Sequence, residues 1–360
     1  MAQIDGFFKL MNDEGASDLH IVAEQQPILR IRGDMERVKY KKLGNDELRA
    51  MLYEICPEEK IKLFEETGDI DFGYEIPGLA RYRCNYFQQK YGIGAVFREI
   101  PSDIMTCEQL GLPKIVSRLA YLPKGLVLVT GPTGSGKSTT LAAIVDEANR
   151  SRKDHILTIE DPIEFVHKSQ KCVINHREVG THTKSFTAAL RGALREDPDI
   201  ILVGEMRDLE TISLAMEAAM TGHLVFGTLH TINAMKTVDR VIEIFPANQQ
   251  EQVRSTLSDS LRAVVSQTLF KRVDVKGRCA ALEILIATPG VRNLIREGKT
   301  YQILSAMQTG KKYGMQTLDD AIMHYLERKM ISPDDAYSNA VEKAKFAPFL
   351  RKKPADFTEV

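Results

Sequence analysis

The segment from Gly131 to Ser138 constrains the fold of this 360-residue chain more than any other feature. It matches the pattern G-x-x-x-x-G-K-[ST] without a departure. The apolar run Leu126–Thr130 comes directly before it, and Lys137–Asn149, with apolar residues at helical spacing, follows. A strand, a glycine-rich loop and a helix in this order predict a P-loop, whose backbone N–H groups and helix N-terminus bind phosphate oxygens.

A P-loop predicts a site for ATP and Mg²⁺. Lys137 is expected to reach the β- and γ-phosphates, and Ser138 is expected to ligand Mg²⁺. A glycine-rich turn that holds Lys and Ser by coincidence is the alternative, and the flanking strand and helix argue against it. The expected nucleotide-binding residues are Gly131, Pro132, Thr133, Gly134, Ser135, Gly136, Lys137, Ser138 and Thr139.

Acidic residues follow two of the apolar runs. Ile156–Ile159 leads into Glu160 and Glu164, and Ile200–Val203 leads into Gly204-Glu205. The carboxyl ends of parallel strands share one edge of a sheet with the P-loop, which groups these acids. Gly204 stands where many P-loop enzymes have a Mg²⁺-binding Asp, so Glu205 is expected to serve the metal. Which of the three glutamates polarises the attacking water stays open, and a helix cap or surface acid is the alternative role.

Two histidines bracket the apolar run Leu224–Leu229. His223 and His230 have an odd separation, which places them on opposite faces of a strand. One is expected to sense the γ-phosphate, while the other packs or bridges to a neighbour. An ordinary structural histidine is the alternative at each position.

The first 100 residues read as a small α/β domain. A helix is expected with Asn45 as its N-cap, and period two in the run 81–85 places Arg81, Arg83 and Asn85 on one face. Residues 101–114, with two prolines and a glycine, are expected to form a linker. The strands expected in this domain are Asp18–Val22, Ile28–Arg32, Asp71–Tyr74, Ala80–Phe87 and Gly94–Ile100.

From about Ile115, apolar strands alternate with helical segments, which predicts a mostly parallel sheet. The region after Pro246 is expected to be helical, with Leu257, Leu261, Val264, Val265 and Leu269 on one helical face. The tail from Lys352 is expected to fray. Expected strands are Leu126–Thr130, His155–Ile159, Ile200–Val203 and Leu224–Leu229, and expected C-terminal helices are Val291–Arg296, Tyr301–Met307, Thr317–Lys329 and Pro333–Asn339.

The composition bears on location and partners. A net charge of −1 gives no global attraction to nucleic acid or anionic lipid. No apolar run approaches the ~18 residues of a membrane span, and no secretory signal is evident, so a cytoplasmic location is expected. The five cysteines lie far apart without a C-x-x-C pair, so zinc is not expected.

Together these segments resemble the secretion-type hexameric ATPases over nearly the whole chain, and within them the retraction motors of type IV pili. The family also carries glycine at the position of Gly204. The segments that carry the resemblance are 16–21 (start of a PAS-like N-terminal domain), 131–138 (Walker A), 158–164 (acidic box), 197–208 (Walker B) and 221–230 (histidine box).

The resemblance implies a PAS-like N-terminal α/β domain over residues 1–100 and a RecA-like P-loop ATPase domain over residues 115–360, helical from about 247. It also implies that N-terminal arginines reach the nucleotide, within a subunit or across an interface. Arg83 and Arg98 match the expected positions, and Arg81 shares a face with Arg83. An arginine there would stabilise charge on the γ-phosphate; solvent-facing strand arginines are the alternative.

The implied function is that of a homohexamer that couples ATP hydrolysis to pilus retraction. The implied partners are an inner-membrane platform protein and, indirectly, pilin, with the motor peripheral to the inner membrane at the pilus base. The assignment to the retraction subgroup is based first on residues 290–299. They are similar to a retraction motif of the family but have Gly290 where Ala is usual. The assignment is also based on the lack of the zinc-binding cysteines that extension and type II secretion motors usually carry, and on the start of the chain near the PAS-like domain.

Other functions remain as alternatives. An accessory retraction motor is the nearest, followed by a pilus-extension or type II secretion ATPase. A RecA-like nucleic-acid motor is more distant, because the chain has near-neutral charge and no basic-aromatic stripe. An ABC transporter subunit is a weaker alternative, because this chain has no L-S-G-G-Q segment. A nucleotide sensor or scaffold ring that does not hydrolyse ATP is a further alternative. The presence of Lys137, Ser138 and Glu205 argues against it.

Overall fold

A computed structural model describes residues 2–31, 33–100 and 103–350, which form two compact units. Unit 1 consists of Met1–Asp103 and Pro162–Val166, and unit 2 of Ile104–Asp161 and His167–Val360. Residues 101–102 of the expected linker lie outside the described residues. From Ile104 on, the expected linker groups with unit 2, where Cys107 and Leu112 are buried in the core.

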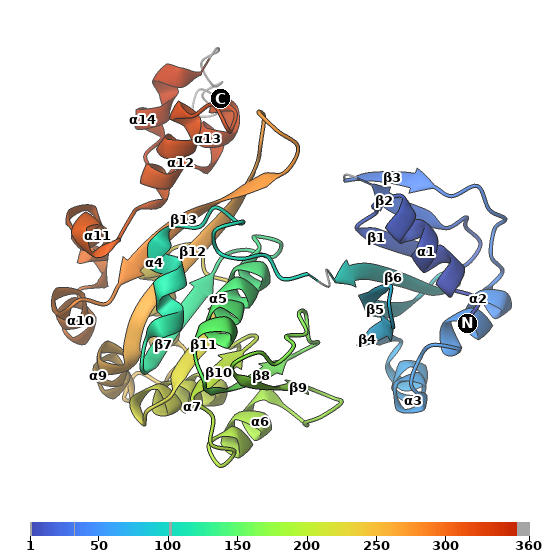
Figure 1. Cartoon of the computed structure of the whole chain (residues 1–360), viewed down its shortest axis with the longest axis horizontal. Coiled ribbons are helices and arrows are strands. Elements are labelled where there is room, and N and C mark those ends of the chain that lie inside the picture. Colours follow the sequence, from blue (N-terminus) through green and yellow to red (C-terminus); the bar gives the residue numbers. More distant parts are fainter. Residues whose placement is uncertain (1, 32, 101–102, 351–360) are drawn as a thin grey trace. The chain divides into compact units, whose positions relative to one another are not determined.

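Unit 1 is an antiparallel sheet with helices beside it (Figure 1). Its six strands have the order β3-β2-β1-β6-β5-β4. All five expected strands are confirmed to within a few residues; Arg32 lies outside the described residues. β3, which is polar and exposed, was not expected. The elements are α1 (Asp5–Asp13), β1 (Asp18–Val22), β2 (Ile28–Ile31), β3 (Asp34–Arg37), α2 (Asn45–Tyr53), α3 (Glu58–Thr67), β4 (Asp69–Ile76), β5 (Ala80–Gln89) and β6 (Gly92–Ile100).

The alternation in β5 is confirmed, because Tyr82 and Cys84 are fully buried, while Arg81 and Arg83, which alternate with them, are only partly buried. Tyr82 stacks on Phe8 of α1 with ring centroids 4.2 Å apart. The expected N-cap is wrong by one residue: α2 begins at Asn45 after Gly44. The Asn45 side chain instead accepts a hydrogen bond from the Ile93 N–H at 2.9 Å, which ties α2 to β6.

Unit 2 is built on a seven-stranded sheet of order β13-β12-β7-β11-β10-β8-β9 (Figure 1). The strands from β12 to β9 are parallel, and β13 pairs antiparallel with β12. The four expected strands are confirmed. The strands are β7 (Gly125–Thr130), β8 (His155–Glu160), β9 (Val173–Glu178), β10 (Ile200–Val203), β11 (Leu224–Leu229), β12 (Leu261–Lys271) and β13 (Arg278–Ile286).

Helices cover both faces of this sheet. On one face, Leu126, Leu157 and Val225 pack with helices that include α6 (Phe186–Ala193), α7 (Leu209–Met220) and α8 (Ala234–Glu243). On the other face, Val127 and Phe226 pack with α4 (Lys114–Arg118), η1 (Leu119–Tyr121) and α5 (Lys137–Ser151). Strands buried on both faces explain the near-continuous apolar runs that predicted them.

The helical interpretation is confirmed at Leu257 but wrong from Leu261 to Leu269. α9 (Gln250–Ser260) ends before Leu261, and β12 begins there. Its residues from Ala263 to Gln267 are all buried, because β7 and β13 flank the strand and side chains cover both faces. β13 was not expected either. Five apolar positions matched a helical period by chance, although the adjacent β-branched pair Val264-Val265 favours a buried strand.

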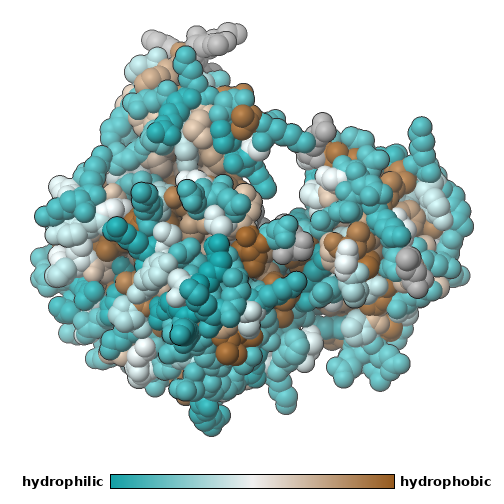
Figure 2. All heavy atoms as spheres, in the orientation of Figure 1, coloured by the Kyte–Doolittle hydropathy of each residue, from teal (hydrophilic) through white to brown (hydrophobic). Residues whose placement is uncertain are grey.

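The remaining C-terminal segments are helical as expected. Their elements are α10 (Pro289–Arg296), η2 (Thr300–Gln302), α11 (Ile303–Thr309), η3 (Lys311–Tyr313), α12 (Leu318–Glu327), α13 (Pro333–Asn339), α14 (Lys343–Phe346) and η4 (Ala347–Phe349). The expected fraying from Lys352 lies outside the described residues. Among the described residues, every helix falls short of the length and apolarity needed to cross a bilayer. Hydrophilic residues dominate the visible surface, with hydrophobic ones scattered among them (Figure 2).

Candidate nucleotide site

The P-loop joins β7 to α5 with a backbone that glycine adopts readily and other residues rarely do. The φ angle is +143° at Gly131, +77° at Gly134 and +86° at Gly136. A Cβ at Gly131 would lie 2.4 Å from the Gln267 carbonyl oxygen, and one at Gly136 would lie 2.7 Å from Gln267 Nε2. The loop therefore requires glycine for conformation and for its close approach to β12.

Lys137 opens α5 and is buried, and its Nζ donates to the carbonyl oxygens of Gly131 at 2.9 Å and Pro132 at 3.0 Å. The positive end of the helix dipole lies at the same place. Ser135 Oγ is buried and has no hydrogen-bond partner among the described residues. The loop fits a phosphate group. Its other expected residues are exposed or half-buried: Pro132, Thr133, Gly134, Gly136, Ser138 and Thr139.

Glu205 lies just beyond β10 between Arg207 and His230. Its Oε1 is 2.8 Å from His230 Nε2, and its carboxylate pairs with Arg207 at 2.5 and 2.6 Å. Burial acts to raise the pKa of Glu205, but the hydrogen bonds and charge of Arg207, together with His230, outweigh burial and lower it. Glu205 is therefore an ionised carboxylate whose orientation is fixed. The structure brings two of the expected residues, Glu205 and His230, into direct contact.

Gly204 lies against the end of β8. A Cβ there would lie 3.2 Å from the Ile159 carbonyl oxygen and 3.3 Å from Glu160 Cα. An aspartate at this position would crowd the backbone, which gives a physical reason for glycine in this Walker B segment. Glu160 is buried at the end of β8, with His176 Nδ1 3.9 Å from its Oε1. Glu164 belongs to the segment Pro162–Val166 of unit 1.

His223 lies at the opposite end of β11 from His230. Its Nδ1 is 2.9 Å from the Ala218 carbonyl oxygen and 3.5 Å from Thr221 Oγ1, and neither residue belongs to the P-loop edge. The structure thus holds one of the two histidines beside Glu205 and the other in a turn after α7.

The three candidate arginines lie in unit 1 on β5 and β6. Arg83 pairs with Asp71 through Nε at 3.0 Å and Nη2 at 2.5 Å. Arg98 Nε donates to Asp18 at 2.8 Å, and Arg81 lies 3.7 Å from Glu75. Arg83 and Arg98 are directly opposite each other in the β5–β6 register. Arg83 and Arg98 thus form hydrogen bonds with acids of their own unit.

The residues at this site fit Mg²⁺ by donor chemistry. Ser138 supplies a half-buried hydroxyl at the start of α5, and Glu205 supplies a carboxylate that the lowered pKa keeps ionised. Hydroxyl and carboxylate oxygens are the hard donors that Mg²⁺ prefers. β7 and β10, which lead to these two residues, both flank β11 in the sheet.

Sequence reasoning missed the residues beneath the loop. Gln267 and Thr140 are both buried and contact each other, and Ser266 Oγ lies 2.7 Å from Thr130 Oγ1. Because the region after Pro246 was interpreted as helical, nothing brought this strand to the P-loop. The available signal was the pair Ser266-Gln267 inside an otherwise apolar run, since buried polar side chains require partners.

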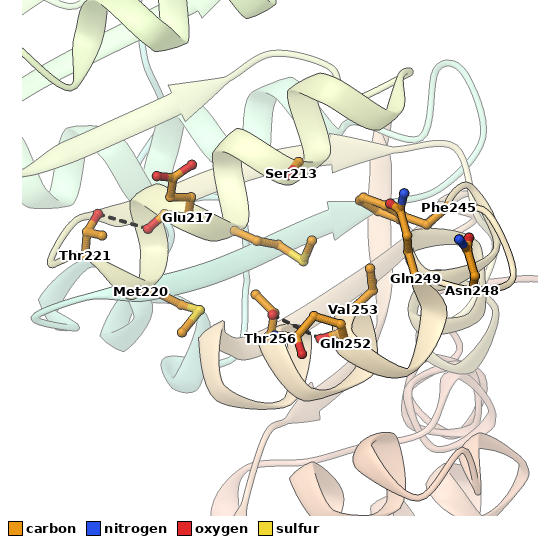
Figure 3. A pocket seen from close by; sticks show the side chains of 11 residues that line it. Ser213, Glu217, Met220, Thr221, Phe245, Asn248, Gln249, Gln252, Val253 and Thr256 are labelled. Carbon is orange, nitrogen blue, oxygen red and sulfur yellow. Dashed lines mark hydrogen bonds between the residues drawn. The ribbon is translucent and has the colours of Figure 1, made fainter.

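A separate hollow of about 560 Å³ lies between α7 and α9 (Figure 3). Met216, Met220 and Phe245 supply apolar lining, and Glu217 and Thr221 supply polar lining. None of the residues lining it belongs to the P-loop or to the carboxyl ends of the parallel strands. It is therefore distinct from the site described above.

Comparisons with known proteins identify relatives over nearly the whole chain. The type IV pilus retraction ATPase PilT of Pseudomonas aeruginosa is 56% identical over 332 residues, 92% of this chain and 95% of that protein. PilU, a type IV pilus ATPase of the same organism, is 38% identical over 94% of this chain and 88% of its own length. A crystal structure of the pilus retraction motor PilT with bound ADP superimposes with a TM-score of 0.88 at 43% identity, covering 96% of this chain and 98% of that one.

A family model described as Type II/IV secretion system protein matches residues 4–294. The match covers most of both units, including the P-loop and the strand ends that carry Glu160, Glu205 and His230. Among the relatives compared, identity to PilT exceeds identity to PilU by a wide margin. The chain belongs to the family of type II/IV secretion system proteins, and within it to the pilus retraction ATPases.

Proposed function

We propose that this chain is a homohexameric motor that hydrolyses ATP with Mg²⁺ and drives the retraction of a type IV pilus. The observation that carries the proposal is the shared sheet edge, where a phosphate-binding loop follows β7 and an ionised Glu205, held by His230, follows β10. The similarity to PilT supports the link from hydrolysis to retraction.

The chemistry follows from the residues at this edge. Lys137 and the loop amides bind the β- and γ-phosphates. Ser138 and Glu205 would hold Mg²⁺, which would supply positive charge to neutralise the phosphates. An ionised glutamate orients the attacking water; Glu160, Glu164 and Glu205 are the candidates. Arg81, Arg83 and Arg98 stabilise charge on the γ-phosphate, from the same subunit or a neighbour. His230 senses the γ-phosphate through its contact with Glu205.

The proposed setting is the cytoplasmic side of the inner membrane at the base of the pilus. There the hexamer would bind a membrane platform protein peripherally and act on pilin through it. The proposal includes no nucleic acid and no zinc. Retraction is favoured over the accessory role because identity to PilT is 56% against 38% to PilU.

Replacement of Lys137 tests the hydrolytic site. Lys137→Ala removes the ammonium from the phosphate loop and should reduce phosphate release by about 100-fold or more. Circular dichroism checks that the variant is folded, and Lys124→Ala, an exposed lysine just before β7, is the matched control. Wild-type hydrolysis by Lys137→Ala would show that the site is misassigned.

Deletion in the host tests the direction of work. Abundant surface pili without twitching would support retraction, and restoration of twitching by the wild-type chain but not by Lys137→Ala would tie it to hydrolysis. Loss of surface pili would instead indicate an extension motor and contradict the proposal.

A further inference from the structure

β12 extends beyond the end of its neighbour β7 and runs beneath the P-loop. The two strands are parallel, and Ser266 is paired with Thr130, the last residue of β7. The next residue of β12, Gln267, therefore lies under the loop itself. Its side chain is only 3% exposed, and its main-chain oxygen is the atom that a Cβ at Gly131 would strike.

Both halves of the Gln267 amide are used. Nε2 donates to the carbonyl oxygen of Ser135 at 2.6 Å, and Oε1 accepts from Thr140 Oγ1 at 2.7 Å. A carbonyl oxygen can only accept a hydrogen bond, so the Ser135 contact fixes which end of the amide is nitrogen. One side chain thus joins the middle of the phosphate loop to the first turn of α5.

We propose that Gln267 is a positioning residue for nucleotide binding, an inference that rests on the proposed function of the P-loop. By donating a hydrogen bond to the Ser135 carbonyl oxygen, Gln267 keeps that oxygen pointing into the protein interior. The N–H groups of the loop are then free to point toward the phosphates. By binding Thr140, it holds the first turn of α5 in register with the loop. Loss of Gln267 would leave a buried carbonyl and a buried hydroxyl without partners, so the loop would relax away from this conformation.

If Gln267 had only a packing role, its substitution would have a different effect from the one that the positioning role predicts. If Gln267 only filled space under the loop, an apolar residue of similar size would change thermal stability but leave nucleotide affinity intact. The two roles are therefore separated by measuring affinity and the melting temperature of the nucleotide-free protein on the same variants.

The first test compares Gln267→Leu with Thr268→Val in the full chain, using titration with fluorescently labelled ADP. Thr268 is the next residue of β12, is half-buried, and makes no side-chain hydrogen bond in the described part of the chain. Gln267→Leu should weaken ADP binding by about 10- to 100-fold and raise KM for ATP more than it lowers kcat. Thr268→Val should bind as the wild type does. Equal affinity of Gln267→Leu and wild type would overturn the proposal.

A second variant keeps the test decisive if Gln267→Leu does not fold. Gln267→Glu retains the acceptor for Thr140 but, when ionised, cannot donate to Ser135 and repels phosphate. Its ADP affinity should be weak at neutral pH and recover as the pH falls, because the protonated carboxyl regains the donor; wild-type affinity should show no such recovery. Affinity within about twofold of wild type at every pH, including alkaline pH where the carboxylate must be ionised, would exclude the positioning role.

Lys137→Ala separates this inference from the proposed function. If Lys137→Ala binds ADP as tightly as the wild type, the phosphate site itself is misassigned. If Lys137→Ala loses affinity while the Gln267 variants keep it, only the role of Gln267 is wrong.

Discussion

At the residue scale, the pairing of Glu205 with Arg207 sets the protonation of a carboxylate in the candidate site. The pKa of Glu205 is lowered despite burial, with Arg207 as the main lowering influence. A lowered pKa means that activity dependent on the ionised carboxylate is present above it and lost as the pH falls through it. Arg207→Ala should therefore move the acid limb of the pH profile of kcat/KM to higher pH.

The control for this prediction is Arg191→Ala. Arg191 pairs with Glu210 on an exposed surface of unit 2, so its loss changes a similar ion pair remote from Glu205. Its acid limb should coincide with that of the wild type. An unchanged acid limb in Arg207→Ala would show that Glu205 is not the group that titrates.

Two glycines give opposite predictions for the same substitution. Gly204→Ala places a methyl group 3.2 Å from the Ile159 carbonyl oxygen, so it should destabilise the fold by about 1–3 kcal/mol. Gly290 lies in α10, and its nearest heavy atom to an added Cβ is Thr288 Oγ1 at 4.0 Å. Gly290→Ala should stabilise the fold by about 0.4–1 kcal/mol. Urea unfolding measures both, and equal effects would contradict the packing argument.

Residue-level prediction from sequence worked where spacing alone defines the geometry. The glycine positions of the P-loop and the placement of Glu205 beyond a buried strand follow from motif and strand order. The contact between Glu205 and His230 depends on the neighbouring positions of β10 and β11, which no local pattern specifies. Gln267 could not be found until β12 was placed beside β7.

At the element scale, one buried carboxylate on β13 joins two helices. Glu283 Oε1 accepts from the Ala234 N–H at the start of α8 at 2.7 Å, and the Leu318 N–H at the start of α12 also bonds to it. Burial raises its pKa, and these hydrogen bonds only partly oppose that effect. A carboxyl with a raised folded-state pKa stabilises most at low pH and loses this contribution as the pH rises.

Replacement of Glu283 tests this connection. Glu283→Gln keeps an oxygen acceptor and removes the ionisable group, so its stability relative to wild type should increase as the pH rises through about 4.3 and above. Glu283→Ala should destabilise the fold by about 1–3 kcal/mol, because two helix N-termini lose their acceptor. Chemical unfolding across pH measures both. A parallel pH dependence for Glu283→Gln and wild type would show that this carboxyl does not titrate on unfolding.

Strands and helices were predicted best from the sequence where one hydrophobic pattern fitted only one type of element. β7, β8, β10 and β11 are short apolar runs, and the sheet buries both of their faces. β9 was missed because it lies at the edge of the sheet with mixed burial, so neither alternation nor a continuous apolar run marks it. β12 was missed because positions three and four apart occur in any continuous apolar run.

At the scale of the whole molecule, the two units have independent hydrophobic cores. Every residue assigned to the core of unit 1 falls between Ile4 and Phe97. A fragment of residues 1–103 should therefore unfold cooperatively on its own, whereas residues 1–79, which lack β5 and β6 from the middle of the sheet, should not. Thermal unfolding by circular dichroism makes the comparison. A non-cooperative transition for residues 1–103 would show that the unit depends on the rest of the chain.

β12 also has a mechanical consequence. Past Gln267 the strand continues to Phe270, which packs with Ile322 and Phe346 of the C-terminal helices. A pull on those helices along the strand would strain its parallel ladder with β7 in shear, so that all the cross-strand bonds share the load instead of breaking one after another. β12 would therefore stretch very little under load. A displacement of the C-terminal helices would reach the residues beneath the P-loop almost undiminished.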